Sequence, residues 1–334
     1  MEEGADIGQT IRRWARAQAP DWGLKSQNVA VRRVLSRGGF GQWVYRVAAP
    51  DPDAPALFLK AAPSDKAAGL KRWATMSERL AAFYHAPRVL ALEAPDSLPD
   101  LVVLVTEAVG GRALTTRGAQ DVLPSLLPVL QRLHQDGEIL VATSDRLTLR
   151  EAYQNALGRR LAEDLQVIQE RVGDLPDPIR GRIPALIRGA SLVDEAVACL
   201  SAFDGPATAV THGDPNWHNI LHDPVTAAWH LLDWDDLAVG DPAFDWAVVL
   251  FRTMRSARVA IPPRAAALLR LDPATTRRTE TYLAASIVDR AIDSLADYVE
   301  AVDWVSEAQR AWARRYFMNL HEDGWRWGNR AQLF

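Results

Sequence analysis

VTHGDPNWHNILHDPVTAAWHLLDWDD, residues 210–236, is the stretch on which the interpretation of this chain depends. Its apolar residues favour two short strands, at residues 208–210 and 227–233. Acidic, amide and imidazole side chains gather where these strands end: His212, Asp214, His218, Asn219, His222, Asp233, Asp235 and Asp236. The order and spacing of these groups indicate which chemistry they can serve.

A metal site built on the histidines is one interpretation. His218 and His222 are four residues apart, which on a helix would place both on one face, as in a zinc site. Pro215 and the strand pattern of residues 219–221 argue against a helix there. We therefore interpret His212 as a structural histidine that braces the loop and the other two as local residues, and we keep a zinc hydrolase as the weaker hypothesis.

A magnesium–nucleotide site is the other interpretation. Asp214 and Asn219 follow the first strand, and Asp233 ends the second. Phosphoryl transfer needs a carboxylate near the acceptor hydroxyl, and an amide oxygen and a second carboxylate are suitable ligands for Mg²⁺. These residues supply the required groups in a single ordered set.

Two features upstream strengthen this second interpretation. Gly38, Gly39 and Gly41 lie between two strand patterns, where glycine lets the backbone turn tightly and approach a phosphate. The cluster alone would equally fit a plain hairpin. Lys60 ends the apolar strand ALFLK, where an inward-pointing lysine would need an anionic partner and an edge lysine would not.

The pattern of the chain changes near residue 108. Before it, five segments read as strands, at residues 29–35, 42–48, 56–61, 88–92 and 101–107, with a helix at about residues 65–84. After it, helical patterns dominate, at residues 123–135, 150–172, 179–203 and again from about residue 241 to the end. The sequence therefore predicts an α+β protein with a first domain at residues 1–107 and a second at residues 108–334.

Composition excludes several classes of protein. The 334 residues include 48% hydrophobic residues, enough for a sizeable core, and carry a net charge of −4 without a long basic run. We therefore expect no nucleic-acid partner. A single cysteine, Cys199, suits a reducing compartment, and no run of about 18 apolar residues predicts a membrane span. These features favour a cytoplasmic protein.

The central motifs carry a family resemblance. HGDPNWHNIL followed by LLDWDDLAVGDPAFDWA resembles the signature of the aminoglycoside phosphotransferase and choline kinase group. These enzymes are relatives of protein kinases that act on small molecules. RGGFGQWVYRV, LFLK and LVTEAVGGRAL extend the resemblance over most of the chain. It implies a bilobal protein-kinase-like fold, with a small antiparallel-sheet N-lobe and a larger, mainly helical C-lobe. It also implies transfer of the γ-phosphate of ATP, with Mg²⁺, to a hydroxyl of a small molecule.

The resemblance also implies roles for single residues. Asp214 would be the catalytic aspartate, Asn219 and Asp233 would hold Mg²⁺, and Lys60 would meet the ATP phosphates. The glycine cluster would cover the nucleotide, and residues Glu107 to Val109 would form the hinge that contacts adenine through backbone groups. Asp245 would brace the active-site loop, while Asp241 and Pro242 read as the start of a helix.

One departure from the kinase pattern leaves an alternative open. Kinase-like lobes pair the strand lysine with a helix glutamate. Early in the expected helix this chain has Lys71 and Arg72, and its only glutamate, Glu78, comes late. We favour Glu78 as the partner of Lys60, with a solvated surface glutamate as the alternative. The displaced glutamate also supports a second hypothesis, a nucleotide-binding pseudokinase that acts as a partner-binding module.

A row of acids follows one face of the helix expected near the C-terminus. Asp289, Asp293, Asp297 and Glu300 recur at helical spacing opposite an apolar stripe. The simplest expectation is a solvent-facing surface. The sharper hypothesis is a pocket for a cationic substrate.

Overall fold

The computed structural model describes residues 2–24, 28–34, 43–51, 55–143, 146–257, 269–300 and 307–334. The chain divides into two compact units. The first unit is Met1–Leu133 with Asp214–Leu237, and the second unit is His134–Gly213 with Ala238–Phe334. Most of the quoted stretch thus packs with the sheet of the first unit. The nucleotide-binding domain expected to end at residue 107 stays a prediction.

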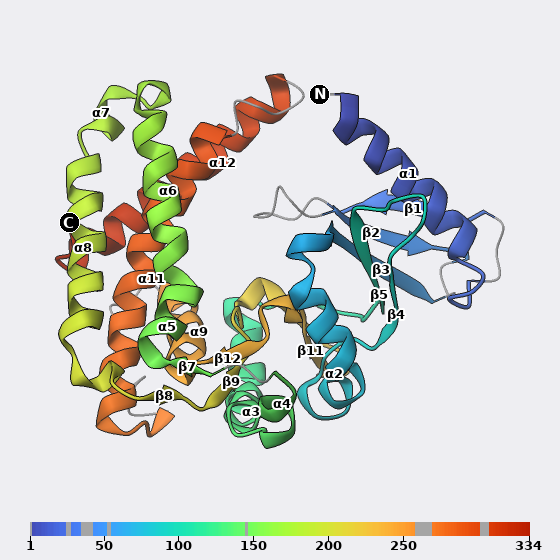
Figure 1. Ribbon diagram of the computed structural model, residues 1–334, viewed down its shortest axis with the longest axis horizontal. Helices are drawn as coiled ribbons and strands as arrows, with labels where there is room; N and C mark the ends of the chain where they lie inside the picture. Colours follow the sequence, from blue (N-terminus) through green and yellow to red (C-terminus); the bar gives the residue numbers. More distant parts are fainter. Residues whose placement is uncertain are drawn as a thin grey trace. The chain divides into compact units, whose positions relative to one another are not determined.

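The first unit is built on a five-stranded sheet with the order β1-β2-β3-β5-β4 (Figure 1). All neighbouring strands run antiparallel. Each predicted strand is present, with these bounds: β1 (Ala30–Arg33), β2 (Trp43–Ala48), β3 (Ala56–Pro63), β4 (Val89–Glu93) and β5 (Leu101–Glu107). β3 lies at the centre of the order, and its burial alternates along the strand: Leu57 and Leu59 are buried, whereas Phe58 and Lys60 are only partly buried.

One face of this sheet is covered by α1 (Glu2–Gln18), a helix that the sequence interpretation did not include. Ile11 of α1 is fully buried in the same apolar cluster as Leu57 and Leu59 of β3. Because successive side chains of a strand point to opposite faces, Lys60 lies on the face away from this cluster.

The second helix, α2 (Ala68–Tyr84), packs against β4, β5 and the tight 3₁₀ turn Trp234–Asp236. Its first turn approaches that turn so closely that a Cβ at Gly69 would lie 1.9 Å from the carbonyl oxygen of Asp235. Only glycine permits this contact. Arg72 of α2 donates from Nε to the carbonyl oxygen of Leu237 at 2.8 Å. The N-terminal part of α2 is therefore seated directly on the stretch that follows Asp233.

The remaining short strands of the first unit hold the quoted stretch in place. β10 (Ile220–His222) pairs with β11 (Trp229–Leu231) and with β6 (Arg112–Ala113) in a three-stranded sheet. The 3₁₀ turn Trp217–Asn219 precedes β10. His218 and His222 therefore do not share a helix face, as Pro215 indicated. The long helix α3 (Thr116–His134) completes this unit up to Leu133.

The second unit is mainly helical (Figure 1). Its centre is α11 (Pro273–Glu300), which contacts α6, α8, α9 and α12 and is buried on most of its circumference. Its other elements are α4 (Gly137–Thr143), α5 (Leu149–Tyr153), α6 (Arg159–Glu170), α7 (Asp177–Arg180), α8 (Ile183–Cys199), α9 (Pro242–Ala257), α12 (Glu307–Arg330) and the short strands β7 (Leu147–Thr148), β8 (Pro206–Ala207), β9 (Ala209–Thr211) and β12 (Ala238–Gly240). Within the described ranges, none of the helices combines the length and apolarity that crossing a membrane requires.

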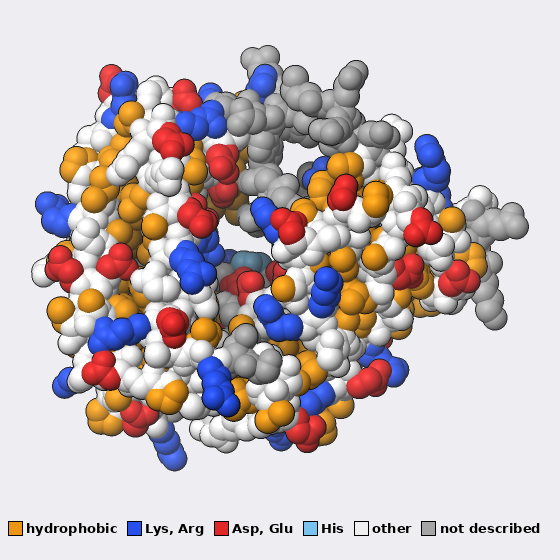
Figure 2. Space-filling view, viewed as in Figure 1, with side chains coloured by type: hydrophobic (Ala, Val, Ile, Leu, Met, Phe, Trp, Pro, Cys, Tyr) orange, Lys and Arg blue, Asp and Glu red, His pale blue; other side chains and the backbone are white. Residues whose placement is uncertain are grey.

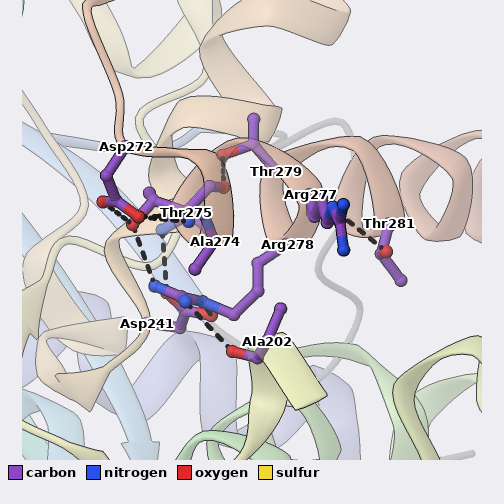
Figure 3. A network of polar contacts seen from close by, with 10 residues as sticks. Ala202, Asp241, Asp272, Ala274, Thr275, Arg277, Arg278, Thr279 and Thr281 are labelled. Atoms are coloured by element: carbon purple, nitrogen blue, oxygen red, sulfur yellow. Dashed lines mark hydrogen bonds and ion pairs between the residues drawn. The ribbon is translucent and has the colours of Figure 1, made fainter. Parts of the chain in front are cut away.

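A buried ion pair ties α11 to the start of α9 (Figure 3). Asp241 caps α9 by accepting from the backbone N–H of Ala243 at 3.1 Å, as the sequence predicted. Its other oxygen accepts from Arg278 Nε of α11 at 2.8 Å. Arg278 also donates to the carbonyl oxygen of Ala202 at 3.0 Å. Burial raises the pKa of Asp241, and Arg278 opposes that rise.

We predict that Arg278→Ala lowers the free energy of unfolding by roughly 3–5 kcal/mol, because it leaves the buried Asp241 carboxylate without its cation. The matched control is Arg277→Ala, which removes the neighbouring, exposed arginine and should cost less than about 0.5 kcal/mol. Urea denaturation of both variants measures the difference. Equal losses would contradict a specific role for the Arg278–Asp241 pair.

Candidate active site

Lys60 of β3 is the centre of the candidate site in the first unit. Its side chain is 13% exposed, and Nζ donates to Oδ1 of Asp233 and to Oδ1 of Asp235, the latter at 2.8 Å. Burial alone would lower the pKa of Lys60, but the two carboxylates outweigh burial and the pKa is raised. Lys60 is thus a buried, charged lysine with anionic partners and not an edge lysine.

The backbone after β11 brings both carboxylates to the same lysine. Asp233 has φ 67° and ψ 63°, the left-handed conformation that Asp tolerates better than most residues, and the turn Trp234–Asp236 follows at once. Trp234 is fully buried and donates from Nε1 to the carbonyl oxygen of Leu231 at 2.7 Å. This anchor fixes the turn. The Asp233 side chain is 41% exposed and that of Asp235 only 15%.

Asp214 and Asn219 form the second half of the candidate site. The Asn219 side-chain amide donates from Nδ2 to Oδ2 of Asp214 at 2.8 Å and to its backbone oxygen at 3.0 Å. Asn219 Oδ1 accepts no hydrogen bond from any described residue, so it is available as a ligand oxygen. His218 is half exposed, with Nε2 3.8 Å from Oδ2 of Asp214.

The two halves are joined by the backbone. The N–H of Leu232 donates to the carbonyl oxygen of Asn219 at 2.7 Å, and Ile220 pairs with Leu231 across β10 and β11. Asn219 therefore lies opposite Leu232, the residue that precedes Asp233. An amide oxygen and a carboxylate are the hard oxygen donors that suit Mg²⁺. The residues present fit the expected metal.

The histidines offer no comparable set. His212 is fully buried in the second unit, whereas His218 is half exposed in the first. Within the described part of the chain, no group of three or more His, Cys, Asp or Glu side chains is placed to hold a metal. The described residues therefore contain no histidine cluster of the kind that a zinc site needs.

The expected hinge follows β5. Glu107 is engaged with Arg88: its N–H donates to the Arg88 carbonyl oxygen at 3.0 Å, and its Oε1 accepts from the Arg88 N–H at 2.9 Å. The N–H of Ala108 donates to the carbonyl oxygen of Ala56 at 2.9 Å. Val109 makes no backbone hydrogen bond to a described residue. Its backbone groups are therefore available to a ligand, whereas the N–H of Glu107 is already used. The glycine cluster, Gly38, Gly39 and Gly41, lies outside the described residues.

The expected pairing of Lys60 with Glu78 is wrong in this structure. Glu78 is 84% exposed and lies 3.8 Å from Arg88, in a solvent-exposed pair. The physical reason is the seating of α2. Its first turn reaches the Trp234–Asp236 turn through Gly69 and Arg72, which leaves no acid of α2 near the lysine.

Asp245 braces the loop that leads into Asp214, as expected. The Asp245 carboxylate is fully buried in the second unit and accepts from the backbone N–H groups of His212 at 2.9 Å and Gly213 at 3.0 Å. His134 Nε2 lies 2.9 Å from the same carboxylate, and its ring packs edge-on against Trp246. The sequence interpretation missed His134, because nothing local distinguishes it from other residues at the end of a helix.

The acids of α11 do not simply face solvent, as first expected. Asp289 forms a bidentate pair with Arg160 of α6, and only Glu300 of the row is exposed. Burial, followed by repulsion from neighbouring carboxylates, raises the pKa of Asp164 of α6 to about 7, that of Asp293 to about 6 and that of Asp297 to about 8. We call Asp164, Asp289, Asp293 and Asp297 the acid cluster. On the face of the molecule drawn in Figure 2, the acidic and basic side chains of the described residues are interspersed.

Comparison with known proteins gives matches both in sequence and in structure. Residues 33–282 match the sequence model of the phosphotransferase enzyme family. A search of curated proteins gives no match. Among solved structures, the chain is similar to the aminoglycoside phosphotransferase APH(3'')-Id from Streptomyces rimosus ATCC10970, with 22% identity, a TM-score of 0.53 and coverage of 83% of this chain and 97% of that one.

Two further structures are similar. One is APH(2")-IIIa in complex with GDP and kanamycin, with 15% identity, a TM-score of 0.60 and coverage of 94% and 97% of the two chains. The other is a thermostable mutant of APH(4)-Ia in a ternary complex with AMP-PNP and hygromycin B, with 16% identity, a TM-score of 0.56 and coverage of 90% and 96%. At these identities the likeness shows the fold alone, and it confirms the bilobal kinase-like α+β fold.

The acid cluster yields a prediction about pH. The folded pKa of Asp297, about 8, lies above the value of about 3.9 for an unfolded aspartate, so the folded state holds this proton more tightly. This stabilisation is complete below the unfolded pKa and is lost as the pH rises through the folded pKa. Asp297→Asn stays neutral throughout, so its Tm should exceed that of the wild type near pH 9 by the most and should match it only near about pH 3, below the unfolded pKa.

Thermal denaturation across this pH range measures the effect. The control is Asp177→Asn, which removes an exposed carboxylate of the same unit and should leave the pH dependence of Tm unchanged. A Tm difference between Asp297→Asn and the wild type that does not vary with pH would contradict the raised pKa.

Proposed function

Because the chain belongs to the phosphotransferase enzyme family, we propose that it transfers the γ-phosphate of ATP to a hydroxyl group of a small molecule, with Mg²⁺ as cofactor. The observation that carries the proposal is the contact of the charged lysine Lys60 with Asp233. The hydrogen bond from the Leu232 N–H to the Asn219 carbonyl oxygen holds Asn219 opposite Leu232, the residue that precedes Asp233. Nucleotide complexes among similar structures support a nucleotide as the donor.

Each residue of the site has a distinct task in this proposal. Asn219 and Asp233 would hold Mg²⁺, which neutralises charge on the phosphates when bound. Lys60 donates to the phosphates, and the Val109 backbone meets the adenine edge. Asp214 orients the acceptor hydroxyl and accepts its proton, with its own carboxylate oriented by the Asn219 amide.

The acceptor belongs to the aminoglycoside-, other antibiotic-, choline- or sugar-like hydroxyl compounds. Similar structures contain kanamycin and hygromycin B. The acid cluster, within the second unit, is suited to a ligand with amino groups, because the charge of an ammonium group would stabilise carboxylates that burial otherwise keeps protonated. A ligand of this kind would release protons on binding.

A nucleotide-binding pseudokinase remains the second candidate. The observation that favours it is the position of Glu78, far from Lys60. The Asp214–Asn219 contact and the Asp233–Lys60 contact argue for the enzyme, since a protein without turnover needs no oriented acceptor base.

A pair of variants separates the two candidates. Asp214→Asn should keep the nucleotide affinity, because Lys60, the metal ligands and the hinge are untouched, and should reduce turnover by roughly 10²–10⁴-fold. Asp233→Asn should lose both the Mg²⁺-dependent part of nucleotide affinity and turnover. The measurements are calorimetric titration with ATP, with and without Mg²⁺, and ADP release over a panel of amine-bearing and neutral hydroxyl compounds.

Asp100→Asn is the control, an exposed carboxylate of the same unit that should leave both quantities unchanged. Wild-type turnover in Asp214→Asn would refute the catalytic assignment. Nucleotide binding by the wild type with no ADP release on any compound of the panel would favour the pseudokinase.

A further inference from the structure

We propose that Asp235 is the positioning residue for Lys60, in the role that a helix glutamate fills in other kinase-like lobes. Its carboxylate accepts from Lys60 Nζ at 2.8 Å. The inference deepens the proposed function, on which it rests for the nature of the ligand that Lys60 meets. The contact itself lies wholly within the first unit.

The difference in exposure between the two carboxylates assigns them different tasks. Asp233 is 41% exposed, so a ligand can reach it, whereas Asp235 is as buried as the lysine that it contacts. The negative charge of a carboxylate that binds Mg²⁺ is largely neutralised by the metal, so this carboxylate stabilises a nearby lysine less. Once Asp233 is engaged with a metal, Asp235 is the carboxylate left to compensate the buried ammonium group. An uncompensated charge at that depth would be costly.

The helix that supplies the glutamate in other kinase-like lobes cannot do so here. Gly69 and Arg72, in the first turns of α2, contact the backbone of Asp235 and Leu237. The only acid of α2, Glu78, is on its solvent-exposed side. The loop after Asp233 thus occupies the space beside Lys60, and it brings its own acid.

The turn that carries Asp235 is rigidly held, as a positioning residue requires. Trp234 is fully buried and its indole N–H is satisfied by Leu231. On the other side, Gly69 of α2 contacts the Asp235 carbonyl group. The backbone of Asp235 is therefore clamped between the core and α2, and its side chain has a fixed direction toward Lys60.

A double-mutant cycle tests the proposal. Asp235→Asn should weaken the affinity for Mg²⁺–ATP about tenfold or more, because Lys60 loses its permanent partner. In a Lys60→Met background the same change should alter affinity less than about twofold, since Asp235 acts through the lysine. Asp235→Glu should restore part of the affinity. Asp236→Asn, one residue along, is the matched control and should show no coupling to Lys60→Met.

The same cycle on Tm without nucleotide is the second readout. The loss from Lys60→Met plus Asp235→Asn should be clearly smaller than the sum of the single losses, because the double variant removes a buried pair together. Additive effects in both cycles would overturn the proposal. If the wild type binds no Mg²⁺–ATP, the proposed function fails, and the Tm cycle still decides whether Asp235 and Lys60 are coupled.

Discussion

The ammonium group of Lys60, buried between the carboxylates of Asp233 and Asp235, is the interaction on which the first unit depends. A lysine at this depth is stable only with anionic partners. The chain provides them from the loop after β11, not from α2. The left-handed residue Asp233, the buried Trp234 and the glycine contact from α2 all serve to hold that loop against β3. The site therefore depends on the fold of this unit, since the packing of α2 on the turn directs the Asp235 side chain to the lysine.

In the second unit, a buried carboxylate fixes the conformation of a loop. The Asp245 carboxylate accepts hydrogen bonds from the backbone N–H groups of His212 and Gly213, the two residues that precede Asp214 in the chain. A buried carboxylate in this position makes the loop conformation costly to change, because each released N–H would remain unsatisfied. Arg278 and Asp241 fasten the start of the helix that carries Asp245. The acid cluster of α11 and α6 does not stabilise the second unit in this way. Its carboxylates repel one another at high pH, and this repulsion destabilises the folded state.

Sequence patterns predicted the sheet, because alternating apolar residues bounded by turns specify strands locally, as in ALFLK before Lys60. They also predicted the cap at Asp241, whereas the roles of Asp214, Asn219 and Asp233 stay predictions. α1 was missed although Ile7, Ile11, Trp14 and Ala15 recur at helical spacing among its charged residues. The partner of Lys60 could not be predicted, because the contact joins residues 173 and 175 positions apart and depends on how closely α2 approaches the turn. The burial of the α11 acids likewise depends on α6, which no local pattern reveals.

In the proposed division of tasks, Asp233 serves the metal and Asp235 serves the lysine. A crystal structure of the protein with Mg²⁺ and a non-hydrolysable ATP analogue tests it most directly. We expect Asp233 to have left Lys60 and to ligate the metal together with Asn219, while Asp235 remains within hydrogen-bonding distance of Lys60 Nζ. A structure in which Glu78 replaces Asp235 at Lys60, or in which Asp235 leaves the lysine while Asp233 stays on it, would contradict this division of tasks.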